Sequence, residues 1–311
     1  MKYAIFSDIH GNFPALEAAL SDAKKKGADK FLFLGDYYSL FPWGNEVAEL
    51  IRGLEDSAVV ICGNGENRLI NLRTQNQAEW THEQFKMLYW SYQALKPENL
   101  EYLTTLPEST VVSDNGINIY LAHSISLPPK IRLKYFHSLS FRALMEEAPF
   151  SHEEYLALAR EELLSQPDAL EAIDSLPEGI YLFGHNHLQF HMEYKGRIFI
   201  NPGSCGVACD FDTSAAYTLL EQTDGEWHII EKRVEYDIDT TAQSLRSSDF
   251  NAQAPVWSRI IERQLKTGKE GLGCFVRHLI ATAKELGQGE KVPVSNDVWE
   301  AAVLTWRDEN V

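Results

Sequence analysis

Hydrophobic and polar positions alternate along the first two thirds of the chain in the way that buried strands require. Short runs rich in Val, Ile, Leu, Phe and Tyr recur through residues 2–235, and several are followed at once by Gly, Asn, Asp or His. These runs predict strands at 2–7, 30–34, 58–62, 117–122, 180–183, 197–200, 215–220 and 227–234. A helix over 15–26 is expected between the first two strands, because Pro14 opens it and its apolar residues have helical spacing.

The order of these elements indicates the fold class. Strands and helices alternate at the start of the chain, which predicts parallel strands joined by crossover helices, whereas the closely spaced later strands predict hairpins. The expected result is a mixed α/β core over residues 1–237. Two cap-like insertions interrupt this core, at about 76–106 and 124–178. Helices are expected in the second insertion at 138–147, 151–165 and 168–176.

The composition changes beyond Asp237, and we predict a helical C-terminal appendage over residues 238–311. Amphipathic helices are expected at about 255–267, 272–287 and 296–307. The middle one carries an apolar stripe of Leu272, Phe275, Val276, Leu279, Ile280 and Ala283. We expect this stripe to dock onto the main domain, or onto a second subunit of a homo-oligomer, rather than to take a direct part in catalysis.

The composition excludes several classes of protein. With 44% hydrophobic and 23% charged residues among 311, neither wholesale disorder nor a disulfide miniprotein is expected. The net charge of −17 argues against binding to duplex nucleic acid. No apolar run suggests a membrane span and the N-terminus does not have the pattern of a signal peptide. Four cysteines fit a reducing compartment, so we expect a cytoplasmic protein.

Polar side chains follow five of the predicted strands at the points where those strands end. They are Asp8, His10, Asp36, Asn64, His123, His185 and His187. Because the carboxyl ends of strands converge on one crevice in an open α/β sheet, residues distant in sequence can meet there. Carboxylate, amide and imidazole groups bind manganese, iron or zinc, and seven of them are enough for two metal ions.

Glycines stand beside most of these positions, namely Gly11, Gly35, Gly63 and Gly184. A side chain that leaves a strand end to bind a metal needs a sharp turn, often with positive φ, which glycine adopts without a steric penalty. Each short pattern is common by itself, since an Asp-x-His more often opens a helix or a turn. The order and the strand-end placement of all of them together indicate a metal site.

As a set, these blocks resemble the calcineurin-like metallophosphoesterase family over residues 1–235. The matching blocks are Asp8-Ile9-His10-Gly11-Asn12, Gly35-Asp36, Gly63-Asn64-Gly65-Glu66, Ala122-His123, Gly184-His185-Asn186-His187 and Asn201-Pro202-Gly203-Ser204. The resemblance implies the family's fold, a two-sheet β-sandwich flanked by helices. The length and the helical tail look closest to members that act as phosphodiesterases or asymmetric dinucleoside tetraphosphate hydrolases.

The family pattern also implies a role for each of the seven residues. Two groups of three would each hold one divalent ion and a carboxylate would bridge the ions: Asp8, His10 and His187 for the first, Asn64, His123 and His185 for the second, and Asp36 between them. The ions implied are manganese above all, with iron or zinc as alternatives. Two such ions acidify a shared water, so the nucleophile would be a metal-bound hydroxide, and their charge attracts an anionic substrate.

One position departs from the family pattern. Many members have His directly after the motif asparagine, where it can protonate the leaving group or contact the phosphate, whereas here the residue is Gly65, followed by Glu66. The general acid of that pattern is therefore missing. Glu66 either takes over proton transfer or orients a ligand, or it is only solvated or hydrogen-bonded to backbone. Asn64 is expected to contact the substrate as well as the metal.

A basic segment is visible without any family. No Asp or Glu occurs from Asn115 to Met145, whereas several cations and aromatic residues fall there: Lys130, Arg132, Lys134, Tyr135, Phe136, His137 and Arg142. On one interpretation, Lys130 and Arg132 bind distal phosphates while a base stacks on an aromatic ring. On the other, the alternation of polar and apolar residues marks only an amphipathic strand or turn.

These observations favour a phosphoesterase with two metal ions, acting on a phosphodiester or nucleotide, dinucleoside polyphosphates included. The alternative within enzymes is a phosphomonoesterase. The alternative from another class is a non-catalytic binding or scaffold protein on the same fold, which predicts lost ligands, whereas all seven positions are present. The expected partner is a small phosphoester, with no duplex nucleic acid and no membrane.

Overall fold

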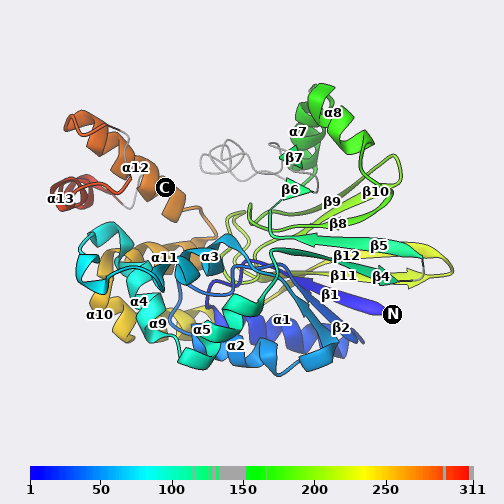
Figure 1. The fold of residues 1–311 in the computed structure, drawn as a ribbon, viewed down its shortest axis with the longest axis horizontal. Coiled ribbons are helices and arrows are strands. Elements are labelled where there is room, and N and C mark those ends of the chain that lie inside the picture. The colour runs from blue at the N-terminus through cyan, green and yellow to red at the C-terminus, as the bar shows by residue number, and fades with distance from the viewer. Residues whose placement is uncertain are drawn as a thin grey trace.

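Two five-stranded sheets packed face to face form the centre of the molecule in the computed structural model (Figure 1). The structure describes residues 1–114, 116–124, 126–127, 131–132, 152–165, 167–289 and 292–307. Helices cover the outer faces of both sheets, so the predicted mixed α/β sandwich is confirmed. No helix within the described ranges is long and apolar enough to cross a membrane.

The first sheet has the strand order β12-β11-β1-β2-β3. Its strands are β1 (Lys2–Phe6), β2 (Lys30–Phe33), β3 (Ala58–Val60), β11 (Ala215–Thr223) and β12 (Glu226–Val234). The first three run parallel, as the alternation of elements predicted, and β11 and β12 form an antiparallel hairpin beside them. The crossover helices α1 (Phe13–Lys25) and α2 (Gly44–Arg52) pack on its outer face.

The second sheet has the order β4-β5-β8-β10-β9. Its strands are β4 (Ser109–Asp114), β5 (Ile117–Ala122), β8 (Gly179–Leu182), β9 (Gln189–Tyr194) and β10 (Arg197–Pro202). The three central strands run parallel, and the two edge strands pair antiparallel. Helices α7 (His152–Leu164) and α8 (Pro167–Asp174) precede β8, and a two-stranded ribbon joins β6 (Ser126–Leu127) to β7 (Ile131–Arg132).

The side chains of β1 show how the layers are held together. Tyr3 and Ile5 point between the two sheets into an apolar core, whereas Ala4 and Phe6 pack on the other face against α1. Side chains alternate between faces along a strand, so a strand buried on both faces needs apolar residues at every position. This is why residues 3–6 form a continuous apolar run instead of an alternating one.

Helices also fill the chain between β3 and β4. They are α3 (Asn64–Leu72), α4 (Lys86–Ala94) and α5 (Pro97–Thr105), with short turns η2 (Gln77–Glu79) and η3 (Glu83–Phe85); a further short turn, η1 (Glu55–Ser57), precedes β3. The stretch predicted as a first insertion, 76–106, therefore holds α4 and α5. Of the helices expected in the second stretch, α7 and α8 are present, and 138–147 lies outside the described residues.

Among the described residues, five helices follow β12: α9 (Ile238–Arg246), α10 (Asp249–Gln253), α11 (Pro255–Thr267), α12 (Leu272–Glu285) and α13 (Asn296–Thr305). The last three were predicted, whereas α9 and α10 were not. The helices pack around Phe275 of α12. Its ring centroid lies 5.3–5.4 Å from those of Trp257, Trp299 and Trp306. Leu40 and Phe41, from the loop after β2, belong to the same apolar cluster, so the helices dock on the main sandwich. The division at residue 237 stays a prediction.

We expect Phe275→Ala to lower the free energy of unfolding by about 3–5 kcal/mol, because the ring is fully buried and its removal leaves a cavity. Urea unfolding followed by circular dichroism measures the change. Leu304→Ala is the matched control, since Leu304 is 75% exposed on α13. A loss no larger than that of the control would contradict the packing around Phe275.

Candidate metal centre

All seven predicted ligands converge where the strands of both sheets end. The first sheet supplies four of them, after β1, β2 and β3, and the second sheet supplies three, after β5 and β8. They are Asp8, His10, Asp36, Asn64, His123, His185 and His187. Because both sheets contribute, the centre depends on the packing of one sheet against the other.

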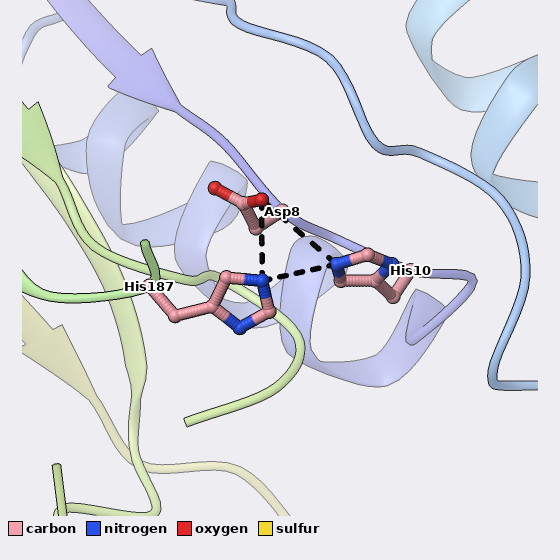
Figure 2. Close-up of side chains that lie close together, drawn as sticks. All are labelled: Asp8, His10 and His187. Carbon is pink, nitrogen blue, oxygen red and sulfur yellow. Dashed lines mark hydrogen bonds and ion pairs between the residues drawn. The ribbon is translucent and has the colours of Figure 1, made fainter. Parts of the chain in front are cut away.

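The first group consists of Asp8, His10 and His187, all buried (Figure 2). The Nε2 atom of His187 lies 3.3 Å from Asp8 Oδ1 and 3.3 Å from His10 Nε2. His10 Nε2 lies 3.8 Å from the same oxygen of Asp8. Two imidazoles and a carboxylate thus present one atom each to a common point, as a metal ion requires.

The second group consists of Asp36, His123 and His185, with Asn64 beside them. His123 Nε2 lies 3.4 Å from Asp36 Oδ2, 3.3 Å from His185 Nδ1 and 3.0 Å from Asn64 Oδ1. The same Oδ2 atom of Asp36 lies 3.8 Å from His10 Nε2 in the first group. A single carboxylate oxygen therefore lies between the two groups, which is the position of a bridging ligand.

Backbone carbonyls fix the orientation of two of the imidazoles. His123 Nδ1 lies 2.7 Å from the carbonyl oxygen of Leu34, and His187 Nδ1 lies 2.9 Å from that of Val207. A carbonyl oxygen only accepts hydrogen bonds, so Nδ1 carries the proton and the Nε2 atoms of the neutral rings are left as acceptors.

When the rings are neutral, acceptor atoms therefore face acceptor atoms in both groups. Asp8 Oδ1 is buried and has no hydrogen-bond partner in the part of the chain that the structure describes. Such an arrangement is unfavourable unless a cation lies between the atoms. The donor set and its geometry thus fit two divalent ions.

The charges of the centre also favour bound cations. Burial lowers the pKa of His10 to about 4, against the opposing pull of Asp36, so this ring is neutral and able to bind a metal. Burial also acts to lower the pKa of His123, but the negative charge of Asp36 and a hydrogen bond to it outweigh burial and raise that pKa to about 10. A positive charge beside Asp36, as a proton on His123 or as a metal ion, is therefore strongly stabilised.

The turns that aim the ligands are made by the ligands themselves. Five of them have backbone φ between 53° and 71°, in the left-handed region: Asp8, His10, Asp36, His185 and His187. A non-glycine residue in this region destabilises the folded state by on the order of 1–3 kcal/mol, which the surrounding structure must offset. The sequence analysis predicted positive φ at the neighbouring glycines. This is confirmed for Gly11 and Gly35 but wrong for Gly63 and Gly184.

Gly184 is needed for space instead of for backbone freedom. A Cβ atom there would lie 2.6 Å from Asp8 Oδ2 and would collide with Ser7. The next residue, His185, donates its backbone N–H to the same oxygen at 2.9 Å. The absence of a side chain thus lets the strand-end loop of the second sheet approach a ligand of the first.

The carboxylate of Glu66 is fully buried and bonded to backbone. One oxygen accepts the N–H groups of Asp36 and Gly63, both at 2.8 Å, and the other accepts those of Tyr37 at 2.8 Å and Tyr38 at 3.3 Å. Burial and the charge of Asp36 raise its pKa to about 7. Of the alternatives for Glu66, the geometry agrees with hydrogen bonding to backbone and gives it a positioning role, because both oxygens are occupied.

Gly65 lies against the bridging carboxylate. Its N–H donates to Asp36 Oδ1 at 2.6 Å, and a Cβ atom at this position would lie 3.0 Å from the same oxygen. Asp36 is therefore held through Oδ1, while Oδ2 faces the imidazoles of His10 and His123. The backbone N–H of residue 65 binds Asp36, and no side chain is present there to donate a proton to a leaving group.

Several residues of the centre were not predicted from the sequence. A cavity of about 1090 Å³ opens from the ligands, and Arg68, Gln84 and Glu270 line it. Arg68 stands four residues after Asn64 on α3, a spacing that puts both on one helix face and could have identified it. No sequence signal marked Gln84 or Glu270, which line the cavity from η3 and from the loop between α11 and α12.

The predicted basic contacts are only partly covered by the structure. Lys130 lies outside the described residues, and Arg132 is described only as a member of β7. Both remain predictions.

The C-terminal helices reach the loop that holds His187. Gln264 donates from Nε2 to the carbonyl oxygen of Ala208 at 3.0 Å, next to the carbonyl of Val207 that orients the imidazole. The thiol of Cys209 lies 3.6 Å from His187 Nδ1 and 3.3 Å from the Glu270 carboxylate. The helical region is thus in contact with the supports of the first ligand group.

Two packed mixed sheets with paired Asp and His ligand groups at their carboxyl ends are the arrangement of a metallophosphoesterase. The model of the calcineurin-like phosphoesterase family matches residues 1–213, and the chain belongs to that family. The recognition made from the sequence blocks is confirmed.

Individual relatives are more distant. The protein MJ0912 of Methanocaldococcus jannaschii, described as uncharacterized, is 28% identical over 251 residues, which cover 76% of this chain and 88% of that protein. A metallophosphoesterase from Sphaerobacter thermophilus has 24% identity and a TM-score of 0.57, with 86% of this chain and all of the other covered. The protein PH1004 from Pyrococcus horikoshii has 20% identity and a TM-score of 0.60, over 86% of this chain and 99% of its own. The two structural matches support the fold alone.

Purified protein is expected to bind two divalent transition-metal ions per chain, and Asp36→Asn is expected to reduce this number and nearly abolish hydrolysis. The amide lacks the charge of the carboxylate whose Oδ2 lies between the two groups. Elemental analysis after equilibration with manganese measures the stoichiometry. Asp29→Asn, at an exposed position, is the control, and one ion per chain at saturation would argue against two sites.

Glu66→Gln is expected to weaken metal binding by about 10–100-fold, because supports of metal ligands commonly have effects of this size. The amide offers one acceptor oxygen and places an NH₂ group against two backbone donors, so stability should also fall by about 1.5–3 kcal/mol. Calorimetric titration with manganese measures the first effect, and urea unfolding measures the second. Glu161→Gln, exposed on α7, is the control. Unchanged metal affinity would show that the hydrogen bonds of Glu66 do not position Asp36.

Proposed function

We propose that this protein hydrolyses phosphodiesters with two divalent transition-metal ions, manganese above all. The observation that carries the proposal is the position of Asp36 Oδ2, which faces His123 at 3.4 Å and His10 at 3.8 Å between two complete ligand groups. When bound at such a pair of sites, the ions activate a water for attack on phosphorus and offset charge on the phosphoryl oxygens. Loss of ligands, which a scaffold role would predict, is not found among the seven positions.

The chain's own residues supply the orientation. Leu34 and Val207 hold the Nδ1 atoms of His123 and His187, so their Nε2 atoms stay directed at the centre. The N-terminus of α3, which begins at Asn64, also lies at the centre. The partial positive charge of this helix end favours an anionic phosphoryl group there. Asn64 can therefore contact both the second ion and the substrate, as the sequence indicated.

A diester is favoured over a monoester by the size of the cavity. Its volume of about 1090 Å³ exceeds by far what a phosphate group needs and is at the upper end of pockets for drug-sized ligands. Dinucleoside polyphosphates remain a narrower proposal, which depends on Lys130 and Arg132. The four cysteines are buried and form no disulfide within the described residues, which supports a reducing, cytoplasmic compartment as part of the proposal.

With manganese present, we expect a bis-aryl phosphate to be cleaved with a higher kcat/KM than the aryl monoester. We also expect kcat/KM to fall steeply as the pKa of the leaving group rises. Gly65 has no side chain that could act as a general acid, and general acid assistance typically raises the rate by about 10²–10⁴-fold. A panel with cyclic nucleotides and dinucleoside polyphosphates, assayed under conditions where chemistry is rate-limiting, measures both quantities.

Asp36→Asn gives the background rate for every substrate of this panel. Faster cleavage of the monoester would favour the phosphomonoesterase alternative. A flat dependence on the leaving group would mean that another residue of the chain acts as the acid.

A further inference from the structure

We infer that the substrate is an amphiphilic phosphodiester, with one large apolar ester group that α12 binds. This inference rests on the proposed function and names the substrate class of the same site. It follows from the lining of the cavity that opens from the metal ligands, because metal ligands and a group of apolar side chains line the same cavity.

The far wall of the cavity is apolar and comes from segments outside the sandwich. Phe85, Leu88 and Val294 contribute to it, together with α12. The near wall consists of metal ligands and the start of α3. A phosphodiester bound at the near wall would thus place one ester group against hydrocarbon. Figure 1 shows α12 on the side of the sandwich toward which β1 and β5 run.

The apolar stripe predicted for α12 divides into two faces. Phe275 and Ala283 are buried in the core of the helical region. Leu272, Val276 and Ile280 follow one another at four-residue spacing and line the cavity, and Val276 is 39% exposed. A row of aliphatic side chains left facing an open cavity forgoes the free energy of burial that an apolar ligand would supply. The stripe therefore serves two purposes, only one of which is docking.

A polar side chain on the cavity wall has an unused donor. Gln84 is only 8% exposed, and its Nε2 group has no hydrogen-bond partner in the described part of the chain. Its Oε1 atom accepts the N–H of Val294 at 3.3 Å, which fixes the amide on the wall. A buried donor without a partner is unfavourable, but the Nε2 atom is itself shielded from the cavity, so Gln84 forms part of the wall and not a ligand contact.

A cation stands near the phosphate end of the same cavity. Arg68 lines it one turn of α3 beyond Asn64. It has no ion-pair partner within the described ranges, although acidic residues outnumber basic ones by 45 to 28 in the chain. A guanidinium is well suited to a non-bridging oxygen of a phosphodiester. The lining of the cavity therefore combines a cation and metal ligands with hydrocarbon.

Three p-nitrophenyl phosphodiesters that differ only in the second ester group test the inference. That group is methyl, octyl or 5′-thymidyl, and each ester is kept in monomeric solution. Because the leaving group is the same, differences in KM report binding of the second group. We expect KM for the octyl ester to be lower than for the methyl ester by about tenfold or more, since each buried methylene contributes to affinity. Arg68→Gln should raise KM for all three by about tenfold.

Val276→Asp should cancel the preference for octyl, whereas Leu304→Asp, at an exposed leucine outside the cavity, should keep it. Equal KM values for the methyl and octyl esters, or a preference that survives Val276→Asp, would overturn the inference. A lower KM for the thymidyl ester than for the octyl ester would also overturn it, in favour of a nucleotide substrate.

Binding without turnover separates this inference from the proposed function. Calorimetry with the manganese-loaded protein should show tighter binding of octylphosphonate than of methylphosphonate, and Val276→Asp should remove the difference. If all three esters resist hydrolysis but this binding difference is found, the proposed reaction is wrong and the apolar subsite stands. If hydrolysis occurs but the two phosphonates bind equally, the subsite is wrong and the reaction stands.

Discussion

The buried carboxylate of Glu66 binds the loop after β2 to the loop after β3, and the geometry of the metal centre depends on this contact. Its two oxygens accept backbone N–H groups from Asp36, Tyr37 and Tyr38 on one side and from Gly63 on the other. The loops are thereby held close enough for the N–H of Gly65 to donate to Asp36 Oδ1. Once that oxygen is occupied, the other one faces His10 and His123.

The second requirement is that the two sheets stay in register. Asp8, at the end of β1, accepts the backbone N–H of His185 from the second sheet through the space that Gly184 leaves open. The aliphatic core between the sheets, which includes Ile5 and Leu182, supports this approach. Five ligands are held with left-handed φ values at a cost in stability. The sandwich therefore supplies the packing energy that keeps these strained loops in place.

The sequence predicted those parts of the molecule that depend on local pattern. The predicted strands are present, because short apolar runs that end in Gly, Asn or Asp have few alternatives to buried strands. The strands β4 and β9 were missed, since the one at 109–114 is half exposed and the one at 189–194 mixes polar and apolar residues. The seven predicted ligands lie close together, as expected because strand-end placement links residues that are distant in sequence.

Contacts between distant segments could not be predicted in this way. Nothing in the spacing around Glu66 distinguishes a carboxylate that holds two loops from one that transfers a proton, since the difference lies in which backbone groups surround it. The apolar pattern of α12 was recognised, but its use as a cavity wall depends on where Gln84 and Arg68 lie in space. The contact of Gln264 with the loop beside His187 likewise joins residues 56 positions apart.

Electron paramagnetic resonance of the protein loaded with manganese tests the central claim most directly, namely that one carboxylate, Asp36, joins two ions. Two Mn²⁺ ions that share a bridging ligand are magnetically coupled, so the account predicts the many-line spectrum of a coupled pair at full loading. This spectrum should be replaced in Asp36→Asn by that of isolated ions. A spectrum of two independent Mn²⁺ ions in the unaltered protein would contradict the account.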